Sequence, residues 1–163
     1  MKHVLVVIFF LLMIGCSSKK GPVPTYTDRW ENLSGEYINK PVEIKVNDGV
    51  QSLVGHSSLN YQVAVSIPLR NPLNNGLPAE SESKDLEKVE QALSEKLIST
   101  KLAVFAAVIK TDGRCDFIFY TGNQKAVKKQ LDEIGKSIDA YTPDISIKRD
   151  DKWVTYTWFS QWR

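Results

Sequence analysis

Four aspartates near the ends of predicted strands have the clearest capacity for chemistry: Asp112, Asp116, Asp150 and Asp151. Two carboxyl groups about 5 to 9 Å apart in a cleft can carry out glycoside hydrolysis. Asp112 precedes a glycine, however, and aspartate is also common in turns because its side chain bonds to the nearby backbone. A hydrolase that uses these carboxylates is therefore the alternative hypothesis, and turn formation is the simpler explanation of the same residues.

Cys115 and His56 are two further side chains of types that catalysts use. Alternation along a strand places Cys115 on the same face as Phe117 and Phe119, where a cysteine acts as a small hydrophobic residue with a raised pKa. His56 lies in a predicted loop, and no motif places an acid or an oxyanion hole beside it. A closed zinc site needs about four nitrogen or sulfur ligands, more than these residues supply. We assign no catalytic residue, metal or cofactor.

The predicted last strand is rich in aromatic side chains. Alternation sends about half of them to the face of the sheet that the predicted helices do not cover. Packing within the protein is the simpler explanation, but exposed aromatic residues also mark interfaces. The candidate binding surface consists of Trp153, Tyr156, Trp158 and Trp162.

The charge balance argues against a nucleic-acid partner. The chain of 163 residues has 21 basic and 19 acidic side chains, so it lacks the excess of positive charge that binding to phosphates requires. Lys125, Lys128 and Lys129 fall on the outer side of a predicted helix, where a solvated helix face explains them.

The first residues read MKHVLVVIFFLLMIGC. A cation at Lys2 and an apolar run from Val4 to Ile14 are typical of a signal peptide, and the run is shorter than the roughly 20 residues of a membrane-spanning helix. Gly15 followed by Cys16 resembles the lipobox of bacterial lipoproteins. This resemblance implies cleavage before Cys16 and attachment of lipid to its thiol.

Three segments follow from this interpretation. Residues 1–15 are the lipoprotein signal peptide, residues 16–27 are an acylated tether that contains two prolines, and residues 28–163 form a single α+β domain. The expected location is the cell envelope. By analogy with sorting in enteric bacteria, Ser17 in place of aspartate favours the periplasmic face of the outer membrane over the inner membrane.

Hydrophobic periodicity predicts the elements of the domain. Alternating apolar residues indicate strands, and apolar residues three or four apart indicate helices. Residues 102–109 are apolar throughout, as in a strand that is covered on both faces. Asp112-Gly113 predicts a hairpin turn. Ser81 or Ser83 could cap the first helix, and Asn123 the second. The predicted elements are a strand pair at 28–47, a strand at 61–69, a helix at 82–100, strands at 102–109 and 115–121, a helix at 123–138, and one long strand or a hairpin at 145–159.

This order predicts a fold. From residue 61 onward it is βαββαβ, the order of a ferredoxin-like sandwich, with an antiparallel sheet and both helices on one face. The N-terminal β-hairpin, or a second copy of the protein, is expected to cover the other face.

Several segments resemble the bacterial domain-of-unknown-function family 695. They are INKPVEIKVNDGV at 38–50, VAVSIPLRNPLNNGLP at 63–78, TDGRCDFIFYTGN at 111–123 and KWVTYTWF at 152–159. The family implies no agreed activity and no residue roles.

Two functions are therefore carried forward. The first is a non-enzymatic binding or scaffold module, tethered to the membrane by lipid on Cys16, with an envelope protein or a second copy as its partner. The alternative is an envelope hydrolase that uses the four aspartates.

Overall fold

The computed structural model describes residues 22–134, 138 and 141–162. Its centre is a six-stranded antiparallel sheet with the strand order β1-β2-β4-β5-β3-β6. The mixed α+β class is confirmed. The strands are β1 (Trp30–Tyr37), β2 (Lys40–Asn47), β3 (Tyr61–Pro68), β4 (Val104–Thr111), β5 (Arg114–Thr121) and β6 (Asp144–Arg149).

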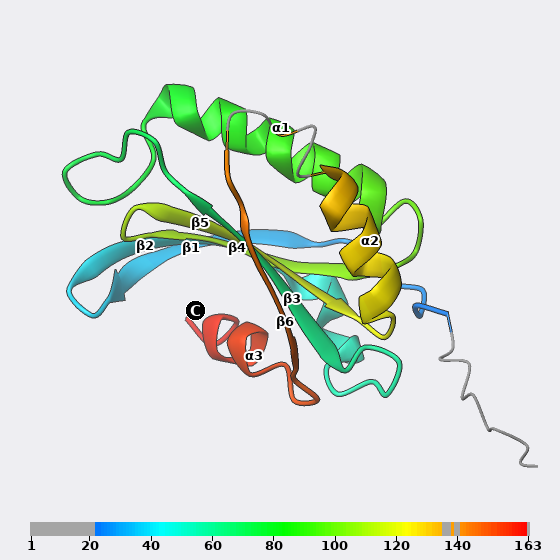
Figure 1. Ribbon diagram of the computed structural model, residues 1–163. Coiled ribbons are helices and arrows are strands. Elements are labelled where there is room, and N and C mark those ends of the chain that lie inside the picture. The colour runs from blue at the N-terminus through cyan, green and yellow to red at the C-terminus, as the bar shows by residue number, and fades with distance from the viewer. Residues whose placement is uncertain (1–21, 135–137, 139–140, 163) are drawn as a thin grey trace, which may run out of the picture.

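Helices lie on both faces of the sheet (Figure 1). As expected, the two long helices α1 (Glu80–Leu97) and α2 (Gln124–Ile134) share one face. The 3-10 helix η1 (Asp48–Leu53) and the short helix α3 (Val154–Phe159) cover the opposite face. The sheet is therefore the middle layer of three.

The strands divide the core into two layers because their side chains alternate between the faces. Phe117 and Phe119 of β5 pack beneath α1 and α2, whereas Ile118 and Tyr120 point towards α3. Residues 104–109 of β4 are all buried, which confirms the prediction of a strand covered on both sides.

The two long helices follow the predicted periodicity. Leu86, Val89, Leu93 and Leu97 form the buried stripe of α1. The prediction of a serine cap on α1 is wrong, since Ala79 occupies the cap position without a side-chain hydrogen bond. The predicted cap of α2 is confirmed, because Asn123 Oδ1 accepts a hydrogen bond from the Ala126 N–H at 3.1 Å.

The N-terminal hairpin does not cover the second face, contrary to the expectation. It extends the sheet instead, because β2 pairs with β4 from Val42↔Thr111 to Val46↔Ala107. The described chain covers that face with η1, the loop that follows it and α3. The four predicted strands from residue 61 onward are adjacent, but they form part of a larger sheet than expected.

The prediction for residues 145–159 is correct only in its first half. The chain forms β6 and then leaves the sheet, with Trp153 at φ 53° and α3 immediately after it. Asp150 promotes this change, since its Oδ1 accepts a hydrogen bond from the Val154 N–H at 3.0 Å at the start of α3. Trp153 and Tyr156 therefore face the core with helical spacing, not with the period of two that a strand requires.

The turn between β1 and β2 contains an isoleucine in the left-handed region. Ile38 and Asn39 have φ values of 51° and 59°, the pattern of a type I′ turn. A β-branched residue at positive φ costs about 1–2 kcal/mol, and Ile38 is 74% exposed, so it buries little area in return. Asparagine is preferred at this position.

We expect Ile38→Asn to raise the free energy of unfolding by about 1 kcal/mol, measured by chemical denaturation. Leu73→Asn is the matched control, because Leu73 is also an exposed apolar loop residue but does not have a positive φ. An equal gain in both variants would attribute the effect to side-chain polarity and contradict the explanation from backbone strain.

Candidate binding surface

Trp153 anchors the C-terminal segment to the sheet. Its side chain is fully buried, and its ring stacks on that of Tyr120 with centroids 3.8 Å apart and planes 4° from parallel. The indole N–H donates a hydrogen bond to the Leu59 carbonyl oxygen at 2.9 Å. The left-handed backbone at Trp153 turns the chain so that this ring points at the sheet.

A buried group of polar atoms supports this anchor. The Tyr120 hydroxyl donates to Asp150 Oδ2 at 3.0 Å, and the Gln62 side-chain amide lies 3.4 Å from the same hydroxyl. Burial, and then the charge of Asp150, raises the pKa of Tyr120 above its usual value. The phenol therefore remains a hydrogen-bond donor at neutral pH and holds Asp150 in place.

Tyr156 secures α3 to the end of β2 and to η1. Its hydroxyl donates to the Asn47 carbonyl oxygen at 3.0 Å and lies 3.2 Å from Gln51 Oε1. Tyr156 and Trp153 are both fully buried. Including these two residues in an exposed binding surface was therefore wrong, because their rings belong to the core.

Trp158 is exposed, Trp162 is half-buried against the core, and both form a cluster with two further rings. Trp158 stands 5.0 Å from Tyr37, 4.5 Å from Phe159 and 4.9 Å from Trp162, measured between ring centroids. We call Tyr37, Trp158, Phe159 and Trp162 the aromatic cluster. Trp158 is 41% exposed and Tyr37 is 42% exposed, so the cluster is open to solvent on one side.

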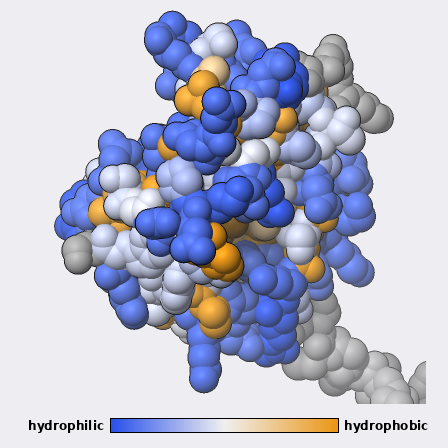
Figure 2. Space-filling view, turned by 90° about the vertical axis from the view of Figure 1, so that its left-hand side faces the viewer, coloured by the Kyte–Doolittle hydropathy of each residue, from blue (hydrophilic) through white to orange (hydrophobic). Residues whose placement is uncertain are grey.

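The aromatic cluster joins α3 to the outermost strand β1. A Cβ atom added to Gly35 would lie 3.0 Å from the Trp162 ring, so the ring rests on the backbone of β1. At the end of the molecule that carries the β1–β2 turn, separate hydrophobic areas interrupt a mostly hydrophilic surface (Figure 2). Sequence reasoning missed Tyr37, and the pairing of the hairpin with the C-terminal segment could not be inferred from periodicity.

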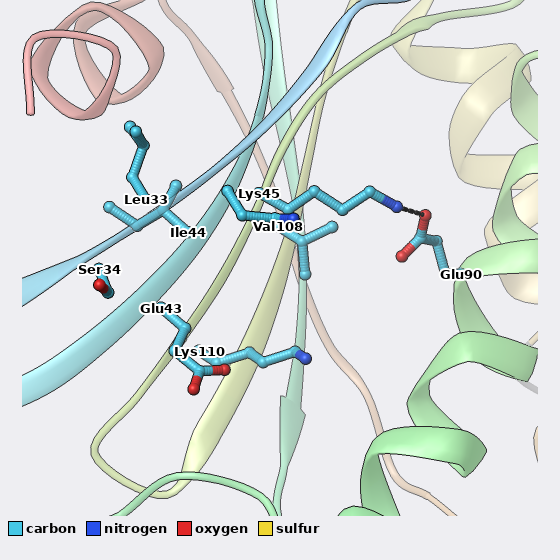
Figure 3. A pocket seen from close by; sticks show the side chains of 9 residues that line it. Leu33, Ser34, Glu43, Ile44, Lys45, Glu90, Val108 and Lys110 are labelled. Atoms are coloured by element: carbon cyan, nitrogen blue, oxygen red, sulfur yellow. Dashed lines mark hydrogen bonds and ion pairs between the residues drawn. The ribbon is translucent and has the colours of Figure 1, made fainter. Parts of the chain in front are cut away.

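The opposite side of the hairpin forms a polar groove beside α1, with a volume of about 280 Å³. Lys45 Nζ and Glu90 Oε1 make an ion pair at 2.7 Å across it, and Glu43 lies beside Lys110 on the neighbouring strand (Figure 3). Asn32 and the other residues of β1 that line the groove are uncharged. The outer strand therefore separates an aromatic surface from a polar one.

The four aspartates of the hydrolase hypothesis do not come together. Asp112 and Asp116 lie at the β4–β5 turn, whereas the Asp150 N–H bonds to the Asn60 carbonyl oxygen at the other end of β3. Each carboxylate has its own partner, and Asp112 pairs with Lys40, Asp116 with Arg114, Asp150 with Tyr120, and Asp151 with Arg149. In the described part of the chain, no group of three or more His, Cys, Asp or Glu residues could hold a metal ion. The convergence that this hypothesis needs is absent from the structure.

Comparison with known proteins identifies the domain. A model described as a family of unknown function (DUF695) matches residues 28–160. The chain belongs to this family. No curated protein and no solved structure matches it. None of the helices in the described ranges has the length and hydrophobicity needed to cross a membrane.

The DUF695 match includes β1, α3 and most of the aromatic cluster. The family predicted from the sequence is thus confirmed. Cys16 lies outside both the matched residues and the residues that the structure describes, and its acylation stays a prediction.

The remaining candidate residues of the DUF695 domain have local roles. The His56 Nδ1 atom lies 2.9 Å from Ser58 Oγ and accepts a hydrogen bond from the Ser58 N–H at 3.2 Å, within an exposed loop. Lys125, Lys128 and Lys129 are exposed on α2, and Lys128 pairs with Asp132 at 3.3 Å. These contacts stabilise a turn and a solvated helix face.

Cys115 is fully buried beneath the two long helices. Burial raises the pKa of its thiol from 9.0 to about 12. Because the pKa of the thiol is higher in the folded than in the unfolded chain, its contribution to the free energy of unfolding is fully present below about pH 9. This contribution is lost as the pH rises through about 12. At neutral pH the thiolate, which is the reactive form, is scarce.

We expect Cys115 in the folded chain to resist alkylation by iodoacetamide at pH 8 and to react within minutes in denaturant. The measurement uses the Cys16→Ser full chain, so that Cys115 is the only thiol present. Free cysteine under the same conditions is the control for reagent activity. Alkylation of the native chain at the rate of free cysteine would contradict the buried, protonated state.

Proposed function

We propose that this DUF695 protein is a lipid-anchored, non-enzymatic binding module of the bacterial cell envelope. The aromatic cluster carries the binding part of the proposal. The Tyr37 and Trp158 rings are 42% and 41% exposed and lie at an edge strand. Tyrosine and tryptophan are enriched in protein interfaces. Trp153 and Tyr156 already fill the second core layer. Core packing therefore does not explain the presence of a tryptophan at position 158.

The order Gly15-Cys16 after an apolar run supports the envelope part of the proposal. A lipid on Cys16 would hold the domain at a membrane surface through residues 16–27. Ser17 directly after Cys16 favours the periplasmic face of the outer membrane. The partner would then be an envelope protein that meets the aromatic cluster.

Metabolic labelling with an alkynyl palmitate analogue in a bacterial host tests the anchor. We expect label on the wild-type chain and none on Cys16→Ala. Cys115→Ala is the matched control and should keep the label, because its thiol lies in the core. An unlabelled wild-type chain, or a labelled Cys16→Ala chain, would contradict lipid attachment at Cys16.

Site-specific photocrosslinking in intact cells tests the binding surface. A photoreactive amino acid in place of Trp158 should give a discrete adduct with an envelope protein. The same amino acid in place of Lys129, which is exposed on the opposite layer, should not. Equal adducts at both positions, or none at Trp158, would contradict a binding role for the aromatic cluster.

We also propose that β3 to β6, with α1 and α2, form a ferredoxin-like unit to which the N-terminal hairpin adds two strands. The adjacent order β4-β5-β3-β6 and the shared face of the two helices support this interpretation. An experimental structure with α1 and α2 on opposite faces of the sheet would contradict it.

A further inference from the structure

The outer edge of β1 differs from the edges that proteins usually leave exposed. β1 has eight residues in unbroken register with β2, and no described strand pairs with its outer side. Edge strands are normally shortened, bulged or protected by lysine or proline. The opposite edge strand, β6, has six residues and ends in Lys148 and Arg149. β1 has neither lysine nor proline.

The geometry of the hairpin determines which backbone groups β1 presents to solvent. A two-residue turn at Ile38-Asn39 makes Tyr37 and Lys40 a hydrogen-bonded pair. Hydrogen-bonded and non-hydrogen-bonded pairs then alternate along the strands. Glu36 lies opposite Pro41, which has no N–H and suits a non-hydrogen-bonded position. The even-numbered residues therefore direct their N–H and C=O groups outward.

The exposure of β1 agrees with this assignment. Asn32, Ser34 and Glu36, which present the outward groups, are all exposed. Their side chains lie on the side of the polar groove, whereas Leu33, Gly35 and Tyr37 lie on the side of the aromatic cluster. An added strand would therefore place its alternate side chains on two chemically different surfaces.

We propose that the outer edge of β1 binds an extended segment of a partner protein by strand addition, and that this segment alternates basic and apolar residues. The inference deepens the proposed binding function by naming the site and the chemistry of the partner. Backbone hydrogen bonds to Asn32, Ser34 and Glu36 supply affinity, and the two surfaces select the side chains.

Charge complementarity favours the basic residues. β1 has no cationic side chain, and Glu36 is its acidic residue on the polar side. A lysine or arginine of the partner opposite Glu36 would lie on the polar side. A second copy paired through β1 would instead offer Glu36 no cationic partner, because neither strand contains lysine or arginine.

The aromatic cluster favours the apolar residues. Paired residues of an antiparallel ladder point to the same face. A partner residue opposite Gly35 therefore lies beside the Trp162 ring, which already rests on the Gly35 backbone. Partner residues opposite Leu33 and Tyr37 would extend this contact in both directions.

A synthetic octapeptide of alternating lysine and valine tests the proposal, with the full chain held in detergent micelles. Binding is measured by fluorescence anisotropy of a label on the peptide. A peptide with four lysines followed by four valines controls for charge and composition. An alternating glutamate–valine peptide tests the sign of the charge. We expect the alternating lysine–valine peptide to bind at least about tenfold more tightly than either control.

Ser34→Pro removes one outward N–H and leaves the bonds between β1 and β2 intact. We expect it to weaken binding about tenfold, whereas Ser34→Ala keeps the amide and should bind as the wild type does. Glu36→Lys should weaken binding and reduce its dependence on salt. Thermal unfolding of each variant checks that the fold is kept.

Three outcomes would overturn the proposal. They are equal binding of the alternating and block lysine–valine peptides, equal binding by Ser34→Pro and Ser34→Ala, or a dimer in light scattering that Ser34→Pro dissociates. The last outcome would assign the edge to a second copy. Failure of peptide binding with intact acylation of Cys16 and intact crosslinking at Trp158 would contradict strand addition alone and leave the proposed function standing.

Discussion

Replacing Trp153 with alanine is expected to lower the free energy of unfolding by about 3–5 kcal/mol. The Trp153 ring is fully buried and stacks on Tyr120, and its N–H is bonded to the Leu59 carbonyl oxygen. Alanine would leave a cavity, an unpaired carbonyl group and a loosened C-terminal segment. The expected effect is large because the free energy of unfolding of a domain is typically only about 5–15 kcal/mol.

Chemical denaturation followed by far-ultraviolet circular dichroism measures this loss. Trp158→Ala is the matched control, because it removes the same side chain from the same helical segment at a site that is 41% exposed. Its cost should stay below about 1.5 kcal/mol, the range of an exposed aromatic pair. Similar losses in the two variants would contradict the division between a buried anchor and an exposed cluster.

Asn47→Ala is expected to lower the free energy of unfolding by about 3 kcal/mol or more. The buried Asn47 side chain makes four hydrogen bonds. Its Oδ1 accepts from the N–H groups of Arg29 and Gly49, and its Nδ2 donates to the Phe105 carbonyl oxygen and to Asp28 Oδ1. Alanine would leave several of these partners unsatisfied inside the protein.

Asn32→Ala is the control for this prediction, since Asn32 is an exposed asparagine on the neighbouring strand. Its effect should stay within about 0.5 kcal/mol. Hydrogen exchange should also show faster exchange of the Gly49 amide in Asn47→Ala, because that N–H loses its acceptor. A loss below about 1 kcal/mol, with unchanged exchange at Gly49, would contradict the role assigned to Asn47.

The elements with a single clear period could be predicted from the sequence. The Leu86 to Leu97 stripe faces one core layer, and the Asp112-Gly113 turn joins β4 to β5. The burial of Cys115 among phenylalanines also followed from alternation. In these segments local propensity and tertiary packing favour the same structure.

The C-terminal segment could not be predicted because two periods compete there. The aromatic and β-branched residues after Asp150 favour a strand by propensity. The hydrogen bond from the Val154 N–H to Asp150, and the left-handed backbone at Trp153, give a helix instead. Tyr120, a distant residue in sequence, holds both Asp150 and Trp153 in place. The sequence therefore placed Trp158 at the surface, as found, but misplaced Trp153 and Tyr156.

The position of the N-terminal hairpin was wrong for a related reason. Alternation in β2 correctly indicated strands, but it does not say whether a hairpin joins the edge of a sheet or packs across its face. Pairing with β4 places Val42, Ile44 and Val46 in the second core layer. This pairing also brings Tyr37 to α3, where its ring joins the aromatic cluster.

The second core layer also bears on how fast the protein folds. The packing of this layer depends on contacts between distant parts of the chain. Examples are the hydrogen bonds of Trp153 with Leu59 and of Tyr156 with Asn47, whose residues are 94 and 109 positions apart. Long-range contacts of this kind form slowly, because the intervening chain must first be ordered. We therefore expect the native state to be reached late. A slowly folding chain stays unfolded for longer, which would suit the export across a membrane that we propose for this protein.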